Sequence, residues 1–223
     1  MSSEPDSSPI FRKFVSRFGS SIEGYLPIDL YHHIRRYSSM YCVDGVPVLT
    51  DKPEVVLIKR LEGEFLPGWW IVGGRVPKSK RETQELKDSF KSEMGLRVSV
   101  QETDYIGRGS IFVPGNSKEN PREYPINTPT SVYAVKIDRR SVAERKIITG
   151  NGNEAWKVFR GSEVLESRTI HPYVKSIVVV ALDRIHGKDW RAEINPKRIR
   201  FVYPRTNREI SKSYFLPLNI ARL

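Results

Sequence analysis

Apolar residues recur along part of this chain at the spacing of an amphipathic helix. Leu86, Phe90 and Met94 are four residues apart, and Gly95 follows the last of them. Residues at this spacing line one face of a helix, and glycine often ends one. The pattern therefore predicts a helix over 82–94 that ends at the glycine.

Two more segments have the same helical spacing of apolar residues. The apolar positions between 174 and 185 lie between Pro172 and Gly187, which suit the first turn and the end of a helix. A third helix is predicted over 27–37, with Pro27 in its first turn. A basic and aromatic segment over 11–18 is interpreted as a short packing helix, in preference to a transit or membrane-surface helix.

Segments rich in β-branched and aromatic residues predict strands. Residues 41–49 and 54–60 are separated by a short polar segment with a proline, which predicts two strands joined by a turn. Residues 97–113 and 130–138 are also strand-like. They flank 114–129, a segment rich in proline, asparagine and glycine that is predicted to be a functional or mobile loop.

Length and composition are those of an ordinary globular protein. The chain has 223 residues, 39% hydrophobic and 28% charged, which predicts one sizeable domain and excludes a collagen-like or wholly disordered chain. The longest apolar run, 177–182, is far shorter than the roughly 18 residues that cross a bilayer, so no membrane association is expected. Cys42 is the single cysteine, which excludes an internal disulfide and favours a cytoplasmic location.

Positive charge is concentrated near the end of the chain. The formal net charge is +11, which attracts polyanions such as nucleotides, nucleic acid or anionic lipid. Residues 188–223 hold nine Lys and Arg against three Asp and Glu, with aromatic residues between them. Such a segment suits either a nucleic-acid arm or an extension docked on the domain, and its apolar content favours docking. We therefore predict a disordered or short-helix extension over 1–25, a domain over 26–187 and a docked basic extension over 188–223.

The segment from 69 to 96 carries the candidate chemistry. A predicted strand with Trp69 and Trp70 leads into Gly73 and Gly74, then into a basic loop and the helix over 82–94. Paired glycines let the backbone approach a ligand or ion, and the helix can present acidic side chains to the same place. The two tryptophans point to opposite sides of a strand, so one is expected in the core while the other, assigned to Trp70, could stack on a base or sugar. Core packing of both is the alternative, and it is somewhat favoured.

At these residues the sequence resembles the Nudix hydrolase superfamily, whose box reads G-x5-E-x7-R-E-U-x-E-E-x-G-U, with U aliphatic. Placing the final G-U on Gly95-Leu96 puts the first glycine on Gly74 without gaps. Among the acidic positions of the box only Glu93 is retained. The other three glutamate positions of the box hold Lys80, Ser89 and Ser92, and its arginine position holds Asp88. The resemblance implies an α/β fold, a Nudix-type α/β/α sandwich with mixed β-sheet, and at most one Mg2+.

Within this superfamily the GDP-mannose mannosyl hydrolases are the most similar, over about two thirds of the chain from Leu26 to near Val180. The resemblance implies that the Gly73 carbonyl and the Glu93 carboxylate bind Mg2+. It also implies that Arg60 and Arg75 neutralise the leaving diphosphate, and that Asp44 lies near the site. Guanidinium groups suit the diphosphate role because they bind phosphate oxygens in pairs.

A general base is harder to assign. In this family a loop supplies a Gln-His pair that provides a metal ligand and the general base. In this sequence the two positions hold Gly152 and Asn153, and neither residue can act as the base. Activation of water is therefore assigned to Glu154 or to a carboxylate of the 114–129 loop, Glu119 or Glu123.

Two functions follow as hypotheses. The first is a hydrolase that uses one Mg2+ and acts on a nucleoside-diphosphate-linked small molecule, most consistent with a nucleotide sugar. The second is a catalytically inactive Nudix-fold module that binds nucleotide or RNA through the same arginines and the basic extension. A carboxylate facing Glu93 favours the enzyme and an all-basic site favours the binding module. A homodimer is left open.

Overall fold

A mixed β-sheet forms the centre of the domain in the computed structural model, which describes residues 39–60, 68–113, 126–143 and 153–199. Seven strands join in it, in the order β3-β2-β1-β6-β5, with β4 paired to β1 and β7 paired to β2. The strands are β1 (Cys42–Leu49), β2 (Glu54–Arg60), β3 (Gly68–Trp70), β4 (Val72–Arg75), β5 (Tyr105–Val113), β6 (Ile126–Ile137) and β7 (Asn153–Arg160). The predicted helices over 11–18 and 27–37 lie outside the described residues.

Strand β1 is the central strand and is buried along nearly its whole length. It runs parallel to β6 and antiparallel to β2 and β4, so the sheet is mixed. A strand covered on both faces has little need for alternating polar residues, which explains the nearly continuous apolar run in this segment.

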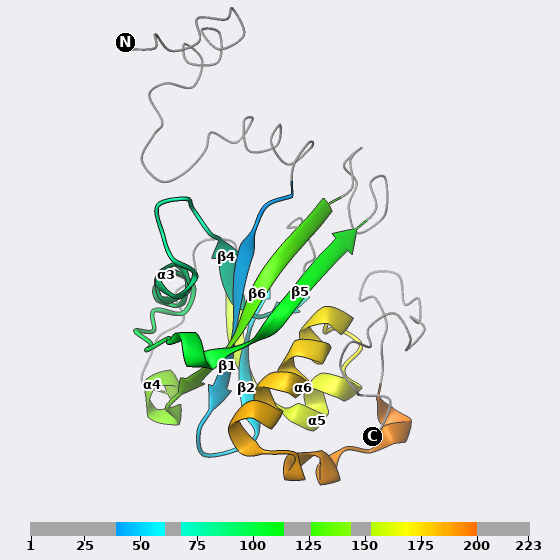
Figure 1. Ribbon diagram of the computed structural model, residues 1–223. Helices are drawn as coiled ribbons and strands as arrows, with labels where there is room; N and C mark the ends of the chain where they lie inside the picture. Colours follow the sequence, from blue (N-terminus) through cyan, green and yellow to red (C-terminus); the bar gives the residue numbers. More distant parts are fainter. Residues whose placement is uncertain (1–38, 61–67, 114–125, 144–152, 200–223) are drawn as a thin grey trace, which may run out of the picture. The chain divides into compact units, whose positions relative to one another are not determined.

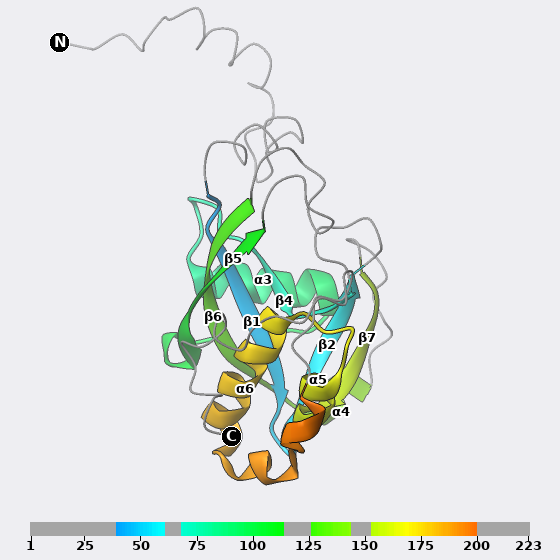
Figure 2. The same ribbon diagram turned by 90° about the vertical axis from the view of Figure 1, so that its right-hand side faces the viewer.

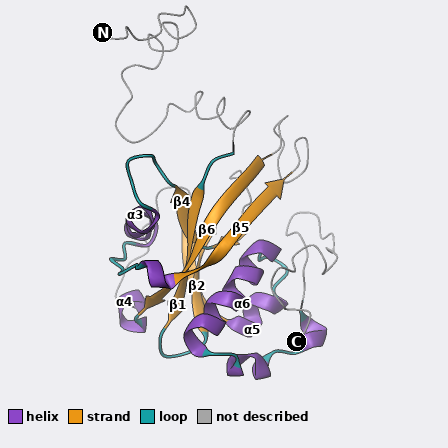
Figure 3. Cartoon of the chain, in the orientation of Figure 1, coloured by secondary structure: helices purple, strands orange, loops and turns teal. Residues whose placement is uncertain are grey.

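Helices cover both faces of the sheet (Figures 1 and 2). The helix α3 (Glu82–Met94) lies on one face, while α5 (Gly161–Glu166) and α6 (Pro172–His186) lie on the other. Figure 3 shows the short helix α4 (Arg139–Ala143) following β6. The expected α/β/α sandwich with a mixed β-sheet is confirmed.

Close packing fixes α3 against the sheet. A Cβ atom on Gly45 of β1 would lie 2.8 Å from the ring of Phe90 and 2.9 Å from the side chain of Leu86. Both α3 side chains are buried, so the helical spacing that predicted this element also marks its core face. The helix ends at Gly95, whose φ of 68° is the left-handed conformation that glycine favours.

Several predicted elements are confirmed and three boundaries are corrected. The helix over 82–94, the strand pair at 42–49 and 54–60, and the helix entered at Pro172 are confirmed. In the predicted strand 97–113, regular strand begins only at Tyr105, after a 3-10 turn (Glu102–Asp104). Strand β6 begins at Ile126, inside the predicted loop 114–129, and strand β7 begins at Asn153, a position that the family resemblance placed in a loop.

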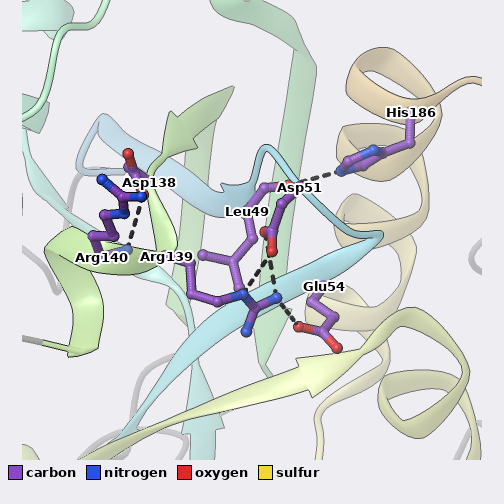
Figure 4. A network of polar contacts seen from close by, with 7 residues as sticks. All are labelled: Leu49, Asp51, Glu54, Asp138, Arg139, Arg140 and His186. Carbon is purple, nitrogen blue, oxygen red and sulfur yellow. Dashed lines mark hydrogen bonds and ion pairs between the residues drawn. The ribbon is translucent and has the colours of Figure 1, made fainter.

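A polar network stabilises the end of the sheet at which a turn connects β1 to β2 (Figure 4). The guanidinium of Arg139 donates to Asp51 at 2.7 Å and also to Glu54, while His186 donates from Nε2 to the Leu49 carbonyl at 2.8 Å. Hydrogen bonds from Arg139 lower the pKa of Asp51 below its ordinary value. The network ties together the turn after β1, the start of α4 and the end of α6.

Residues 188–199 pack against the helical face through Trp190. Its indole is buried and donates from Nε1 to Asp183 of α6 at 3.0 Å, while Arg191 forms an ion pair with the same carboxylate. A Cβ on Gly161 would lie 2.5 Å from the Trp190 ring. This segment contains two 3-10 turns, η2 (Asp189–Glu193) and η3 (Pro196–Arg198). The predicted domain boundaries at 25/26 and 187/188 stay predictions, and residues 200–223 lie outside the described residues.

Among the described residues, no helix has the length and apolar character that a membrane span requires.

Candidate functional site

The pairing of β1 with β4 places Asp44 directly opposite Gly73. A Cβ atom on Gly73 would lie 2.3 Å from Oδ1 of Asp44 and 2.4 Å from the Val43 carbonyl oxygen. Real Cβ atoms essentially never approach other atoms this closely, so the Asp44 carboxylate can reach this backbone only because position 73 is a glycine.

The Glu93 carboxylate approaches the same glycine from the last turn of α3. Its Oε1 accepts a hydrogen bond of 3.4 Å from the Gly73 backbone N–H. Glu93 is half-buried, and its helix is fixed by the packing of Phe90 and Leu86 on β1. Two carboxylates from distant segments therefore approach Gly73, Asp44 from the face of the sheet that α6 covers and Glu93 from α3 on the other face.

Asp44 is a buried carboxylate with a strong hydrogen-bond donor beside it. Its side chain is 7% exposed, and Oδ2 accepts a hydrogen bond of 2.9 Å from the hydroxyl of Tyr173. Burial raises the pKa of Asp44 to about 6, while the Tyr173 hydroxyl and the charge of Arg60 act in the opposite direction. Burial and the neighbouring carboxylate raise the pKa of Tyr173, so its hydroxyl stays a donor.

Trp70 links Tyr173 to Arg60. The Tyr173 ring is stacked on Trp70 with ring centroids 5.9 Å apart, and the Arg60 guanidinium lies 4.8 Å from the centre of the Trp70 ring. Such cation–π contacts hold a guanidinium in place at small entropic cost. Trp70 is only 3% exposed, whereas Trp69 is half-buried, so Trp70 is the core member of the pair. The predicted stacking of Trp70 on a substrate would require Arg60 to move.

His171 fixes the start of α6, and with it the position of Tyr173. Its Nδ1 accepts a hydrogen bond of 3.1 Å from the Tyr173 backbone N–H, as an N-cap side chain does. Burial, with the charge of Lys175 adding to it, lowers the pKa of His171 to about 3. The imidazole is therefore neutral at physiological pH. Lys175 is fully buried and donates to the carbonyls of Leu165 and Ser167.

The structure adds Glu85 to this region, a residue that the sequence reasoning missed. A Cβ on Gly74 would lie 3.4 Å from Oε1 of Glu85 and 3.2 Å from Oγ of Ser89. Glu85, Ser89 and Glu93 are four residues apart on α3 and share one face, and this spacing is the signal that could have identified Glu85.

The other predicted site residues are placed as follows. Arg75 lies on β4 opposite Cys42 of β1, and Arg60 ends β2 opposite Gly68 of β3. The backbone of Glu154 belongs to β7, but its side chain is outside the described residues, as are Gly152, Glu119 and Glu123. The identity of the general base therefore stays a prediction.

The donors at Gly73 fit one Mg2+ ion that is shared with a phosphate ligand. Mg2+ is usually held by one or two carboxylates, with water and substrate phosphates as the remaining ligands. Glu93 and the Gly73 backbone match that set. No group of three or more His, Cys, Asp or Glu side chains that could hold a metal is found in 39–60, 68–113, 126–143 or 153–199. These residues fit neither a protein-only cage nor a multi-metal cluster.

Comparisons with known proteins give matches among solved structures. No family model and no curated protein matches the sequence. A MutT protein from Methanosarcina mazei Go1 is 14% identical, with TM-score 0.49 over 66% of this chain and 94% of that one. The NUDIX domain of Shewanella oneidensis NrtR, solved with ADP ribose, is 14% identical, with TM-score 0.48 over 72% and 99%.

A third solved structure comes from Jonesia denitrificans DSM 20603 and is described as a possible asymmetric diadenosine tetraphosphate hydrolase. It is 17% identical, with TM-score 0.49 over 67% of this chain and 96% of that one. Identities and TM-scores at this level assign no family, so the function has to be argued from the site itself.

Proposed function

We propose that this chain is a Nudix-type hydrolase that cleaves nucleoside-diphosphate-linked compounds, with nucleotide sugars as its substrate class and one Mg2+ as its cofactor. The observation that carries the proposal is that Asp44 and Glu93 both approach the backbone of Gly73, Asp44 from the α6 face of the sheet and Glu93 from α3. Carboxylates beside a glycine backbone, with arginines nearby, suit cation-assisted hydrolysis of a diphosphate-linked substrate better than simple binding of a polyanion, for which an all-basic surface suffices.

Arg60 and Arg75 are proposed to bind the diphosphate. The guanidinium of Arg60 is held over Trp70 and lies close enough to Asp44 to lower the pKa of that carboxyl. A partly desolvated, preorganised guanidinium binds phosphate oxygens in pairs and stabilises negative charge on a leaving diphosphate.

Glu93 and the Gly73 carbonyl are proposed to hold Mg2+, which when bound would neutralise charge on the phosphate oxygens. Asp44 is proposed to accept a hydrogen bond from the substrate through Oδ1, since the Tyr173 hydroxyl donates to Oδ2. Activation of the attacking water is assigned to Glu154, which lies on the strand paired with Arg60 of β2.

Assays of turnover with and without Mg2+ test the proposal. The full-length chain is incubated with a panel of nucleotide sugars and dinucleoside diphosphates, and the release of free sugar and of phosphate is measured separately. We expect Mg2+-dependent cleavage of at least one nucleotide sugar. Nucleotide binding without turnover of any compound would contradict the proposal and favour the binding module.

Replacing Glu93 by glutamine is expected to abolish Mg2+-dependent turnover and to weaken Mg2+ binding. The amide keeps the side-chain volume but removes the anionic oxygen that a hard cation requires. Isothermal titration with Mg2+ in the presence of a nucleoside diphosphate measures the loss. Glu102→Gln, an exposed substitution beyond the end of α3, is the matched control and should behave as the wild type. Equal Mg2+ affinity in Glu93→Gln and the control would refute the assignment.

Replacing Arg60 by alanine is expected to weaken binding of nucleoside diphosphates by about 1.5–3 kcal/mol, because a charge-assisted hydrogen bond is lost. Binding of the corresponding nucleosides should change little. Arg75→Ala should act in the same direction. Lys59→Ala removes a neighbouring exposed cation on β2 and serves as the control. Equal losses for nucleosides and nucleoside diphosphates would show that these arginines do not contact phosphate.

A further inference from the structure

Lys80 lies in the loop before α3 and holds two carboxylates of that helix. Its Nζ is 3.1 Å from Oε2 of Glu85 and 2.9 Å from Oδ2 of Asp88. Gln84 donates a further hydrogen bond of 3.1 Å to the other oxygen of Asp88. The ammonium therefore bridges the first and second turns of the helix.

This is an unfavourable place for a cation unless anions surround it. The N-terminal end of a helix carries partial positive charge, which favours acidic side chains and disfavours a lysine. Hydrogen bonds to Asp88 and then to Glu85 nevertheless raise the pKa of Lys80, and the hydrogen bond from Lys80 lowers the pKa of Asp88. The two carboxylates therefore outweigh the helix dipole.

The same ammonium reaches into the face of α3 that lies at the paired glycines. Glu85 is buried, with Oε1 toward Gly74 and Oε2 on Lys80. One turn further along are Ser89 and then Glu93, which binds the Gly73 N–H. Glu85 therefore lies on the face of α3 beside the glycines, and the Lys80 ammonium already neutralises its charge.

We propose that the Lys80 ammonium is a built-in cation of this site, which holds Glu85 and Asp88 and keeps them from binding a divalent ion. An ammonium satisfies carboxylate oxygens through its three N–H donors, but it cannot bind waters and phosphates in the octahedral arrangement of Mg2+. The inference deepens the proposed function by limiting the chain to the single ion at Glu93. It also explains how Glu85 lies beside Gly74 without contributing to a metal cluster.

Mn2+ binding to the full-length chain tests this inference without depending on turnover. Free Mn2+ is measured by electron paramagnetic resonance during titration of four proteins: the wild type, Lys80→Gln, the double variant Lys80→Gln/Glu85→Gln, and the control Lys87→Gln. The control removes the same charge from α3 at a position seven residues along. Thermal melting checks that each variant is folded.

We expect Lys80→Gln to bind one more Mn2+ per chain than the wild type. The affinity of the variant for this extra ion at Glu85 should exceed that of the wild type by a factor on the order of ten. The extra ion should be absent from the double variant and from Lys87→Gln. The same stoichiometry in Lys80→Gln and the wild type, or the same gain in Lys87→Gln, would overturn the inference.

The result also separates this inference from the proposed function. If the wild type binds no Mn2+ and Lys80→Gln gains a Glu85-dependent ion, the role of Lys80 stands and the Glu93 metal site fails. As a conservative check, Lys80→Arg keeps the cation and should bind Mn2+ as the wild type does. An extra ion in Lys80→Arg would overturn the inference even if Lys80→Gln failed to fold.

Discussion

Alanine at position 190 is expected to lower the free energy of unfolding by about 3–5 kcal/mol, the range for deleting a large buried aromatic side chain. Trp190 is 6% exposed, its ring lies against Gly161, and its indole N–H donates to Asp183. Its loss leaves a cavity beneath residues 188–199 and removes the anchor that holds this segment on α6. Urea unfolding of the full-length protein, followed by circular dichroism, measures the change.

Two variants separate the ring from its polar contacts. Trp190→Phe keeps most of the packing and loses the indole N–H, so a smaller loss of about 1 kcal/mol is expected. Arg191→Ala removes the ion pair with Asp183 but leaves the ring in place. A loss below about 1 kcal/mol in Trp190→Ala itself would mean that the segment contributes little to stability, contrary to its burial.

Alanine at Gly73 is expected to abolish turnover and to destabilise the fold by about 1–3 kcal/mol, the usual cost of overpacking. Its Cβ would lie 2.3 Å from the Asp44 carboxylate and 2.4 Å from the Val43 carbonyl, so β1 and β4 would have to separate. That separation moves both carboxylates that approach this residue. Assays of nucleotide-sugar cleavage and thermal melting follow the two effects.

The neighbouring glycine provides a matched control. A Cβ on Gly74 would meet only the side chains of Ser89 and Glu85, at 3.2 and 3.4 Å, which can adjust. Gly74→Ala should therefore fold nearly as well as the wild type. If Gly73→Ala retained full turnover and stability, the close approach of Asp44 would have no role in either.

Local patterns in the sequence predicted the elements that carry strong periodicity. The helix over 82–94 is confirmed to the residue, because its apolar face is regular and Gly95 takes the left-handed conformation that ends a helix. The central strands were equally clear, because β1 is buried on both faces and its sequence is a nearly continuous apolar run.

Two strands were harder to predict. Within the part of the chain that the structure describes, strand β7 pairs only with β2, and Lys157 and Arg160 are exposed on it, so its sequence alternates weakly. Strand β6 begins in a segment with Pro129, a residue that signals a loop or an edge. In both cases pairing across the sheet decided the conformation over local preference.

The contacts within the candidate site depend on pairings across the sheet that local patterns do not encode. The family resemblance pointed to Asp44, Glu93 and Gly73, but the hydrogen bond between Asp44 and Tyr173 joins positions 129 residues apart. The contact of Lys80 with Glu85 could not be predicted for a related reason. Lys80 is five positions before Glu85 and outside α3, so its ammonium reaches that carboxylate only because of the shape of the turn that precedes the helix.

The long separation between Asp44 and Tyr173 also dictates when the site can form during protein synthesis. Residues 44, 60, 70 and 73 leave the ribosome well before α6 is made, and the parallel partner of β1 also arrives late. Until Tyr173 is translated, the Asp44 carboxylate lacks its phenol and Trp70 lacks its stacked ring. The nascent chain therefore lacks the complete candidate site until most of the domain has been synthesised, and folding of the domain and assembly of the site are completed together.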